Sequence, residues 1–472
     1  MKQFIKEKLN VENLLCFMII ICPILDILSF LFRNYFNTNF SPSTFLRPII
    51  PIIVILIIFF KEKMKLKLIV VGIVYAIYAV IHLWLFNIVK TGSSFGGLIN
   101  ELQFIVNYSF MILNLFIFIY IFKDKQKKKK KKSILIMTSI YILSIWISII
   151  TNTSTTTYIE GIGYKGWFET GNSIGAILIL SMFIIFTMIR EKKYRYWAIA
   201  VIILVGIYTT MMLGTRVGLF GFICVLFLYG LSELLAAILK RIQLNKNILI
   251  ISISVIVIIV IGVTVFGSNT LKRRQHLKEV QQSGQEVTHI SNALLEIKEK
   301  IQNNELEEGY MSEAGKKSII DLYNFANEHE IANNDMRAQQ LIYNICLVKN
   351  QSNIMLILFG NGFQANFTEL ILEMEIPAFL LNFGVFGFIL YFVPLLTIFI
   401  YGLFIGVKYR HEINSEYIMN ILGIFFSFAF SFLSGYTFFN SSSMIIVIVL
   451  NTLLIINIRE LKNKKLKERY NK

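Results

Sequence analysis

Long apolar runs, separated by short clusters of lysine and arginine, dominate the hydropathy pattern of this chain. A hydrocarbon core of about 30 Å is crossed by about 20 apolar helical residues, so runs of that length bounded by charges predict membrane helices. The pattern therefore predicts an all-α polytopic membrane protein with about twelve transmembrane helices. The runs are residues 11–32, 46–60, 66–89, 102–122, 133–151, 168–189, 196–213, 216–239, 248–267, 376–405, 418–435 and 439–457.

The seventh and eighth runs are separated by a tight corner, because residues 196–239 are apolar almost without a break. One continuous helix of this length would be about 66 Å long, twice the thickness of the bilayer core. The chain must therefore turn, and Gly214-Thr215-Arg216 is the only plausible corner. We expect Arg216 at or just below the outer membrane surface.

The composition supports a membrane protein, since 56% of the residues are hydrophobic, 16% are charged and the mean hydropathy is +0.65. A soluble core could not hide so much apolar surface. The formal net charge of +17 argues for no nucleic-acid partner, because the basic residues stand in short bursts between apolar runs and not on one folded face.

These basic bursts predict the orientation of the helices. With twelve helices, every burst falls on the same side of the membrane, and the positive-inside rule makes that side cytoplasmic, together with both chain termini. We interpret the longest burst, Lys127–Lys132, as a solvated topology determinant without chemistry. A lipid-headgroup site or a partner dock is the alternative.

One long segment, residues 268–375, reverses the charge balance, with 10 Lys and Arg against 15 Asp and Glu, net −5. Long loops are translocated regardless of charge, and helical periodicity recurs within it, so we expect a large helical loop outside the membrane. The predicted organisation is transmembrane helices in 1–267, the extracytoplasmic loop in 268–375, three further helices in 376–457 and a basic cytoplasmic tail in 458–472.

Ionisable residues in the outer half of the membrane are costly unless they are paired or face water, so each is a candidate functional residue. Asp26 and Arg47 lie near the outer ends of consecutive helices, where they could form a structural ion pair. Arg216 lies in the glycine-rich corner, where close helix packing explains the glycines equally well. Glu169 opens the sixth helix.

The predicted outer loop adds three further candidates. Arg337 lies early in a predicted helix at headgroup level, where its guanidinium suits a phosphate and where anchoring at the interface is the alternative. Glu373 and Glu375 precede the tenth helix. A helix N-terminus explains one acid, while a partly desolvated carboxylate could also take a proton from a sugar hydroxyl.

Neither a metal nor a cofactor is predicted. The five histidines lack metal-ligand spacing, and no glycine-rich phosphate loop is present. A nucleotide-sugar donor or an ATP-driven step is therefore not expected.

The assembled features resemble the superfamily of O-antigen ligases and O-antigen polymerases. Gly214-Thr215-Arg216-Val217-Gly218 is similar to its corner of small residues and arginine, and Arg337 is similar to an arginine early in its outer loop. The turn Gly360-Asn361-Gly362-Phe363 and the segment Gly384-Val385-Phe386-Gly387 resemble the segments that flank its acceptor site.

The resemblance implies a GT-C-like membrane glycosyltransferase at the outer face of the bacterial cytoplasmic membrane. Its donor would be a glycan on a polyprenyl pyrophosphate such as undecaprenyl pyrophosphate, and its acceptor a glycan or lipid-linked glycan. The product would be capsular or another surface polysaccharide of the cell envelope. Membrane lipid and other polysaccharide-assembly membrane proteins would be further partners.

The resemblance also implies roles for the candidate residues. Arg216 and Arg337 would stabilise the departing pyrophosphate, and Arg47 would hold the second phosphate or only position the helices. Ligases of this family have a histidine where this chain has Glu373, which favours a polymerase with Glu373 or Glu375 as base. Asp26, Glu169, Gly360, Asn361 and Gly362 would support the site.

A transporter or flippase of the same lipid-linked oligosaccharides is the main alternative, and a structural scaffold is a third. A transporter would be expected to show internal repeats or charges near the bilayer midplane. The chain shows no convincing repeat, and its charges cluster outward.

Overall fold

The computed structural model describes residues 11–36, 41–61, 66–89, 97–121, 127–158, 161–240, 257, 263, 267–282, 289–306, 311–329, 331, 336–362, 372–433 and 435–470. Apart from one short antiparallel hairpin, the regular elements in these ranges are helices. Nine of the described helices are long and apolar enough to cross a membrane. The chain is therefore an all-α polytopic membrane protein, as predicted.

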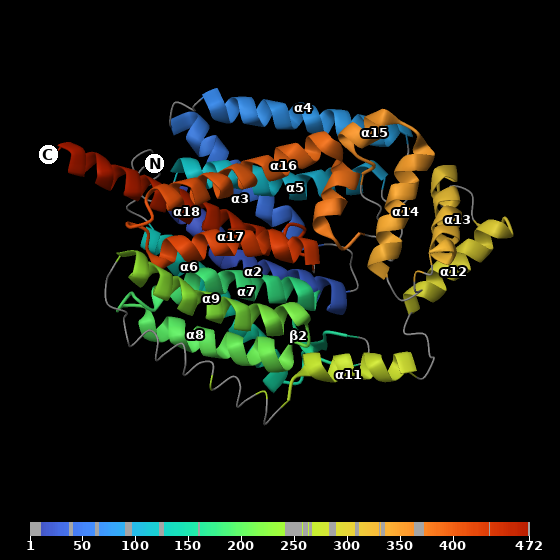
Figure 1. The fold of residues 1–472 in the computed structure, drawn as a ribbon. Coiled ribbons are helices and arrows are strands. Elements are labelled where there is room, and N and C mark those ends of the chain that lie inside the picture. The colour runs from blue at the N-terminus through green and yellow to red at the C-terminus, as the bar shows by residue number, and fades with distance from the viewer. Residues whose placement is uncertain are drawn as a thin grey trace.

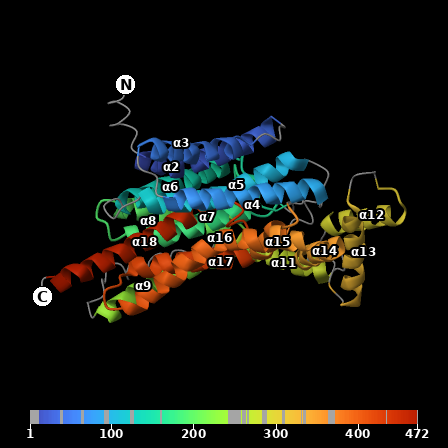
Figure 2. The same cartoon turned by 90° about the horizontal axis from the view of Figure 1, so that it is seen from above.

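The long helices lie side by side in one bundle, as Figures 1 and 2 show. Their bounds are α2 (Val11–Tyr35), α3 (Pro42–Lys61), α4 (Leu66–Val89), α5 (Gly97–Ile121), α6 (Lys127–Ile150), α7 (Gly171–Met188), α8 (Arg195–Ile207), α9 (Arg216–Lys240), α16 (Glu375–Lys408), α17 (Ser415–Leu433) and α18 (Ser441–Tyr470).

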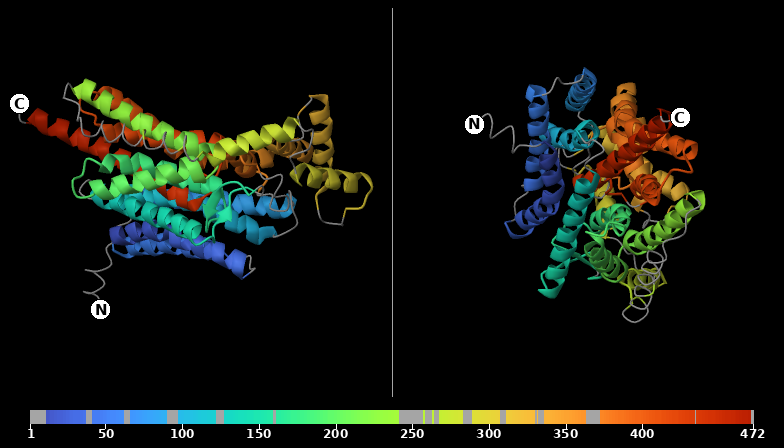
Figure 3. Two further views of the ribbon diagram at one scale, coloured as in Figure 1. Left: turned by 90° about the horizontal axis from the view of Figure 1, so that it is seen from below. Right: turned by 90° about the vertical axis from the view of Figure 1, so that its left-hand side faces the viewer.

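Shorter helices gather at one end of the bundle, which we call the loop end, and project past it in Figure 3. The opposite end, where α6 begins at Lys127, is called the lysine end. The loop-end helices are α11 (Asn269–Gln282), α12 (His289–Gln302), α13 (Glu313–Glu328), α14 (Met336–Gln351) and α15 (Ile354–Phe359), and the hairpin consists of β1 (Thr155–Thr156) and β2 (Tyr164–Gly166).

Eleven of the twelve predicted apolar runs lie on bundle helices. The ninth run, 248–267, falls almost entirely outside the described residues. The number of membrane crossings and the placement of 268–375 outside the membrane therefore stay predictions.

The predicted corner between the seventh and eighth runs is present. Helix α8 continues into one turn of π-helix, η2 (Tyr208–Met212), before the chain turns at Gly214, whose φ is 84°, and α9 begins at Arg216. Two side chains at the start of α11 donate to carbonyls of η2, Ser268 at 2.6 Å and Asn269 at 3.0 Å. The corner is thus tied to the first turn of α11.

Helices α7 and α18 form the centre of the bundle. Nearly all of α7 is buried, and so is α18 as far as Ile458, which is typical of helices that are apolar all round. Peripheral helices instead expose large apolar side chains such as Phe227 and Val407, as a lipid-facing surface would. The segments that precede α7 and α18 at the loop end are therefore attached to tightly packed helices.

Helix α16 is broken at Gly384, where φ is 68° and ψ is −178°. Only glycine adopts this conformation readily, and the break leaves preceding carbonyl groups without partners in the helix. The N–H of Asn361 donates to the carbonyl of Leu381, and the N–H of Gly362 to that of Asn382, both at 3.0 Å. The turn around Asn361 is therefore packed directly on the break.

Two polar side chains of α4 complete this junction. The Tyr78 hydroxyl donates to the carbonyl of Phe383 at 2.8 Å, and Nδ1 of His82 donates to the carbonyl of Phe359 at 2.5 Å. Nε2 of His82 lies 2.7 Å from a carboxyl oxygen of Glu101, and both side chains are fully buried. Neither His82 nor Glu101 is among the residues predicted to be functional from the sequence.

The lysine run at the lysine end is helical and partly buried. Lys131 Nζ lies 2.8 Å from a carboxylate oxygen of Glu416 and 3.5 Å from one of Glu191, while Lys127 Nζ lies 3.0 Å from Glu416. The interpretation of Lys127–Lys132 as solvated is therefore wrong for Lys130 and Lys131, which are 0% and 3% exposed. Carboxylates from two neighbouring segments make the burial of Lys131 tolerable by neutralising its ammonium charge.

We expect Gly384→Ala and Gly360→Ala each to destabilise the protein by about 2 kcal/mol or more, because an added Cβ would collide with backbone of the other segment at a positive φ. Thermal unfolding in detergent measures the effect. Gly72→Ala is the matched control, since nothing lies within 4 Å of its added Cβ. Equal melting temperatures for all three variants would contradict the packing described.

Candidate functional site

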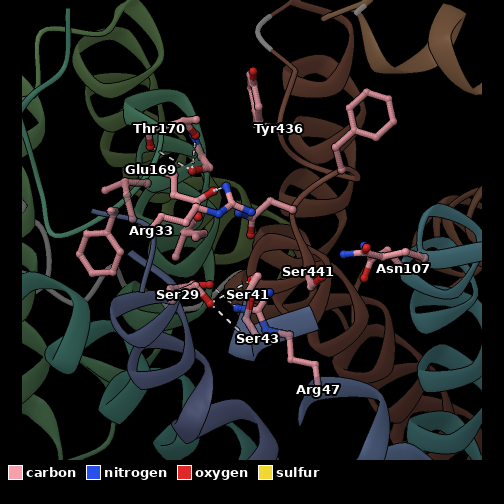
Figure 4. A pocket seen from close by; sticks show the side chains of 18 residues that line it. Ser29, Arg33, Ser41, Ser43, Arg47, Asn107, Glu169, Thr170, Tyr436 and Ser441 are labelled. Atoms are coloured by element: carbon pink, nitrogen blue, oxygen red, sulfur yellow. Dashed lines mark hydrogen bonds and ion pairs between the residues drawn. The ribbon is translucent and has the colours of Figure 1, made fainter. Parts of the chain in front are cut away.

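A polar cavity of about 300 Å³ opens at the loop end between α2, α3, α5, α7 and the start of α18 (Figure 4). Small-molecule pockets are usually lined mainly by apolar side chains, so this lining favours a polar ligand. The lining residues are Asp26, Ser29, Arg33, Ser41, Ser43, Arg47, Gln103, Asn107, Phe168, Glu169, Thr170, Ser173, Ile174, Ile177, Tyr436, Phe439, Asn440 and Ser441.

The ion pair expected between Asp26 and Arg47 is present at the base of this cavity. Nη2 of Arg47 also donates to Ser442 Oγ at 2.8 Å, and the Asp26 carboxylate accepts from Ser442, at 2.7 Å, and from the Tyr141 hydroxyl. The pair thus connects α2, α3, α6 and α18. Arg47 is 6% exposed, and its Nε has no hydrogen-bond partner among the described residues.

A second ion pair lies at the open side of the cavity, where Arg33 Nη1 is 2.9 Å from Glu169 Oε2. Burial raises the pKa of Glu169, and the neighbouring Arg33 partly offsets the rise. Glu169 is one of the candidates predicted from the sequence, whereas Arg33 is not. An arginine at the outer end of the first predicted helix goes against the positive-inside rule, and that signal could have revealed it.

Arg337 and Glu373 form a third pair, farther along the loop end. Nε and Nη2 of Arg337 both lie 3.3 Å from one carboxylate oxygen of Glu373, and both side chains are about two-fifths exposed. The backbone N–H of Glu373 donates to the Gln340 side chain at 3.1 Å. An accessible carboxylate is therefore held beside a guanidinium.

Tyr436 joins this third pair to the cavity. Its side chain lines the cavity, while burial and the charges of Glu373 and Glu375 raise its pKa to about 12. The neighbouring Gly435 packs so closely on the carbonyl of Glu373 that an added Cβ would collide with it. Tyr436 therefore keeps its proton near neutral pH and offers a hydrogen-bond donor between the acid and the cavity.

Glu375 has a different environment from Glu373. It is fully buried, and its two carboxylate oxygens accept from the backbone N–H of Phe438 at 2.9 Å and of Phe439 at 2.6 Å. Successive backbone N–H groups of this kind hold an anion in place. Glu375 thus anchors the segment between α17 and α18, and this arrangement argues against its role as a base.

The sequence matches the family described as O-antigen ligase like membrane protein over residues 8–461, nearly the whole chain. The chain belongs to this family. No curated protein and no solved structure matches it. Family membership makes the chain a membrane enzyme that acts in polysaccharide assembly.

Arg216 of this O-antigen ligase-like protein does not line the cavity. Its side chain is exposed at the start of α9. The preceding Thr215 lies close to Gly171, since its methyl carbon would be 3.4 Å from a Cβ added to that glycine. Gly171 directly follows Thr170, which lines the cavity. Arg216 and the cavity are therefore connected through the first residues of α7.

The remaining predicted site residues of this O-antigen ligase-like protein contact the protein backbone and do not line the cavity. Gly360, Asn361 and Gly362 pack on the break in α16, so they support that helix. Within the described residues, no group of three or more His, Cys, Asp or Glu side chains could hold a metal ion.

We expect Asp26→Leu to destabilise the protein by about 3–5 kcal/mol, because it leaves Arg47 buried without a carboxylate. The double variant Asp26→Leu with Arg47→Met should recover most of this loss. Thermal unfolding in detergent tests both expectations, with Arg33→Met as the half-exposed comparison, whose loss should stay below about 1 kcal/mol. A double variant no more stable than Asp26→Leu would count against the pairing argument.

Proposed function

We propose that this protein is a glycosyltransferase that polymerises or transfers oligosaccharide units carried on a polyprenyl pyrophosphate, at the outer face of the bacterial cytoplasmic membrane. The observation that carries the proposal is the Arg337–Glu373 pair beside a polar cavity, joined to it by Tyr436. Transfer from a pyrophosphate needs a base for the acceptor and cationic groups for the leaving phosphate. The loop end offers both.

In the proposed reaction, Glu373 accepts the proton of an acceptor hydroxyl while that oxygen attacks the anomeric carbon of the donor sugar. The bond between the anomeric carbon and the phosphate oxygen breaks, and its electron pair leaves with the pyrophosphate. Arg337 and Arg216 stabilise the departing negative charge. Direct attack without a covalent intermediate inverts the configuration at the anomeric carbon.

Arg47 has a positioning role in this proposal. Its guanidinium is already paired with Asp26 and bonded to Ser442, which supports a role in holding the helices rather than in binding the second phosphate. Glu375 likewise has a supporting role, because its oxygens are occupied by backbone N–H groups. A carboxylate base at Glu373 favours the polymerase over the ligase form of the reaction.

The length of the polyprenyl-linked glycan in cells tests the proposed function. Cells without this protein should accumulate single repeat units outside the membrane, and Glu373→Gln should reproduce that state at a normal protein level. Glu296→Gln, an exposed substitution on α12, is the matched control and should give normal polymer. Units trapped on the cytoplasmic face would instead indicate a flippase and overturn the proposal.

The two arginines are tested separately. Arg337→Ala and Arg216→Ala should each abolish glycan assembly without lowering the amount of protein, because each removes a cation that faces the leaving pyrophosphate. Polymer length and immunodetection of the protein in the same membranes provide the measurement. Normal polymer in either variant would remove that arginine from the active site.

A further inference from the structure

We propose that the cavity between α2, α3, α5, α7 and α18 is a carbohydrate subsite that holds a neutral sugar unit of the glycan substrate. This inference rests on the proposed glycosyl transfer and adds the place where the sugar is recognised. It assigns to the cavity a different ligand from the pyrophosphate that Arg337 and Arg216 are proposed to hold.

The charge balance of the cavity supports a neutral ligand. Its charged lining residues in the described part of the chain are two arginines and two carboxylates, and Arg47 pairs with Asp26 while Arg33 pairs with Glu169. A pyrophosphate would have to displace Asp26 from the buried Arg47 or remain there without a compensating cation, and both are costly. A neutral polyhydroxyl ligand has neither cost.

The remaining lining suits the hydroxyl groups of a sugar. Asn107, on α5, and Ser441, at the start of α18, both line the cavity (Figure 4). Amides and hydroxyls both donate and accept, so they can match sugar hydroxyls in either direction. Arg47 adds a buried Nε–H that has no partner among the described residues, and Phe439 offers an aromatic face.

The position of the cavity fits a substrate sugar close to the reacting centre. Tyr436 lines the cavity on one side and is close enough to Glu373 for that carboxylate to raise its pKa. A sugar in the cavity would therefore have Tyr436 as a neighbour in common with the proposed base. The same residue then connects recognition of the sugar with the proposed base.

Binding of a free oligosaccharide tests the proposal without requiring turnover. The probe is the repeat unit released by mild acid from the lipid-linked glycan of the same cells, titrated against detergent-purified protein and followed by saturation-transfer NMR. Asn107→Leu should weaken binding by about tenfold, because leucine has a similar size to asparagine but lacks the amide that can hydrogen-bond the sugar. Ser441→Val, on α18, should also weaken it.

Asn114→Leu is the matched control, because Asn114 is a buried asparagine of the same helix that does not line the cavity. It should bind the oligosaccharide as wild type does, and the melting temperatures of all variants are compared to exclude misfolding. Equal oligosaccharide affinity in wild type, Asn107→Leu and Ser441→Val would overturn the proposal. The proposal would also be overturned if these variants bound inorganic pyrophosphate more weakly but bound the oligosaccharide as wild type does.

The Glu373→Gln variant separates this inference from the proposed function. It should lose transfer but keep its affinity for the oligosaccharide. Retained transfer in Glu373→Gln would refute the proposed base and leave the binding result standing. If the subsite is present, varying donor and acceptor concentrations in turn assigns it to the substrate whose KM rises in Asn107→Leu.

Discussion

Backbone groups inside a membrane must find partners within the protein, because the hydrocarbon offers none, and the loop end depends on this constraint. The break in α16 releases carbonyl groups, and the turn at Gly360–Gly362 supplies the missing N–H donors. His82 and Tyr78 add side-chain donors from α4. The same junction fixes where α16 begins, and therefore where Glu373 and Glu375 stand.

Glu373 and Glu375 differ in their burial, although they are only two residues apart. Glu375 is enclosed and accepts backbone N–H groups of the segment before α18, so its carboxyl group holds that segment in place. Glu373 remains half exposed and faces a single guanidinium. A carboxylate that can meet solvent and substrate is available for proton transfer, whereas one enclosed by the backbone is committed to structure.

The sequence predicted the elements of the fold well and the site only in part. Apolar length and flanking charge identify membrane helices because each run must satisfy its own backbone, which is why the corner before Arg216 could be located. The Asp26–Arg47 pair could be predicted because its helices are consecutive. The buried contacts of Lys131 and Glu375 could not, because their partners come from segments distant in the sequence.

The central position of α18 has a consequence for biosynthesis. This helix is the last of the bundle to be made, yet Ser442 completes the Asp26–Arg47 network and Ser441 closes the cavity wall. A ribosome-bound chain that has not released its final helix therefore has an open cavity and an arginine lacking its hydroxyl partner. The cavity wall and the ion-pair network are therefore complete only once α18 has joined the bundle.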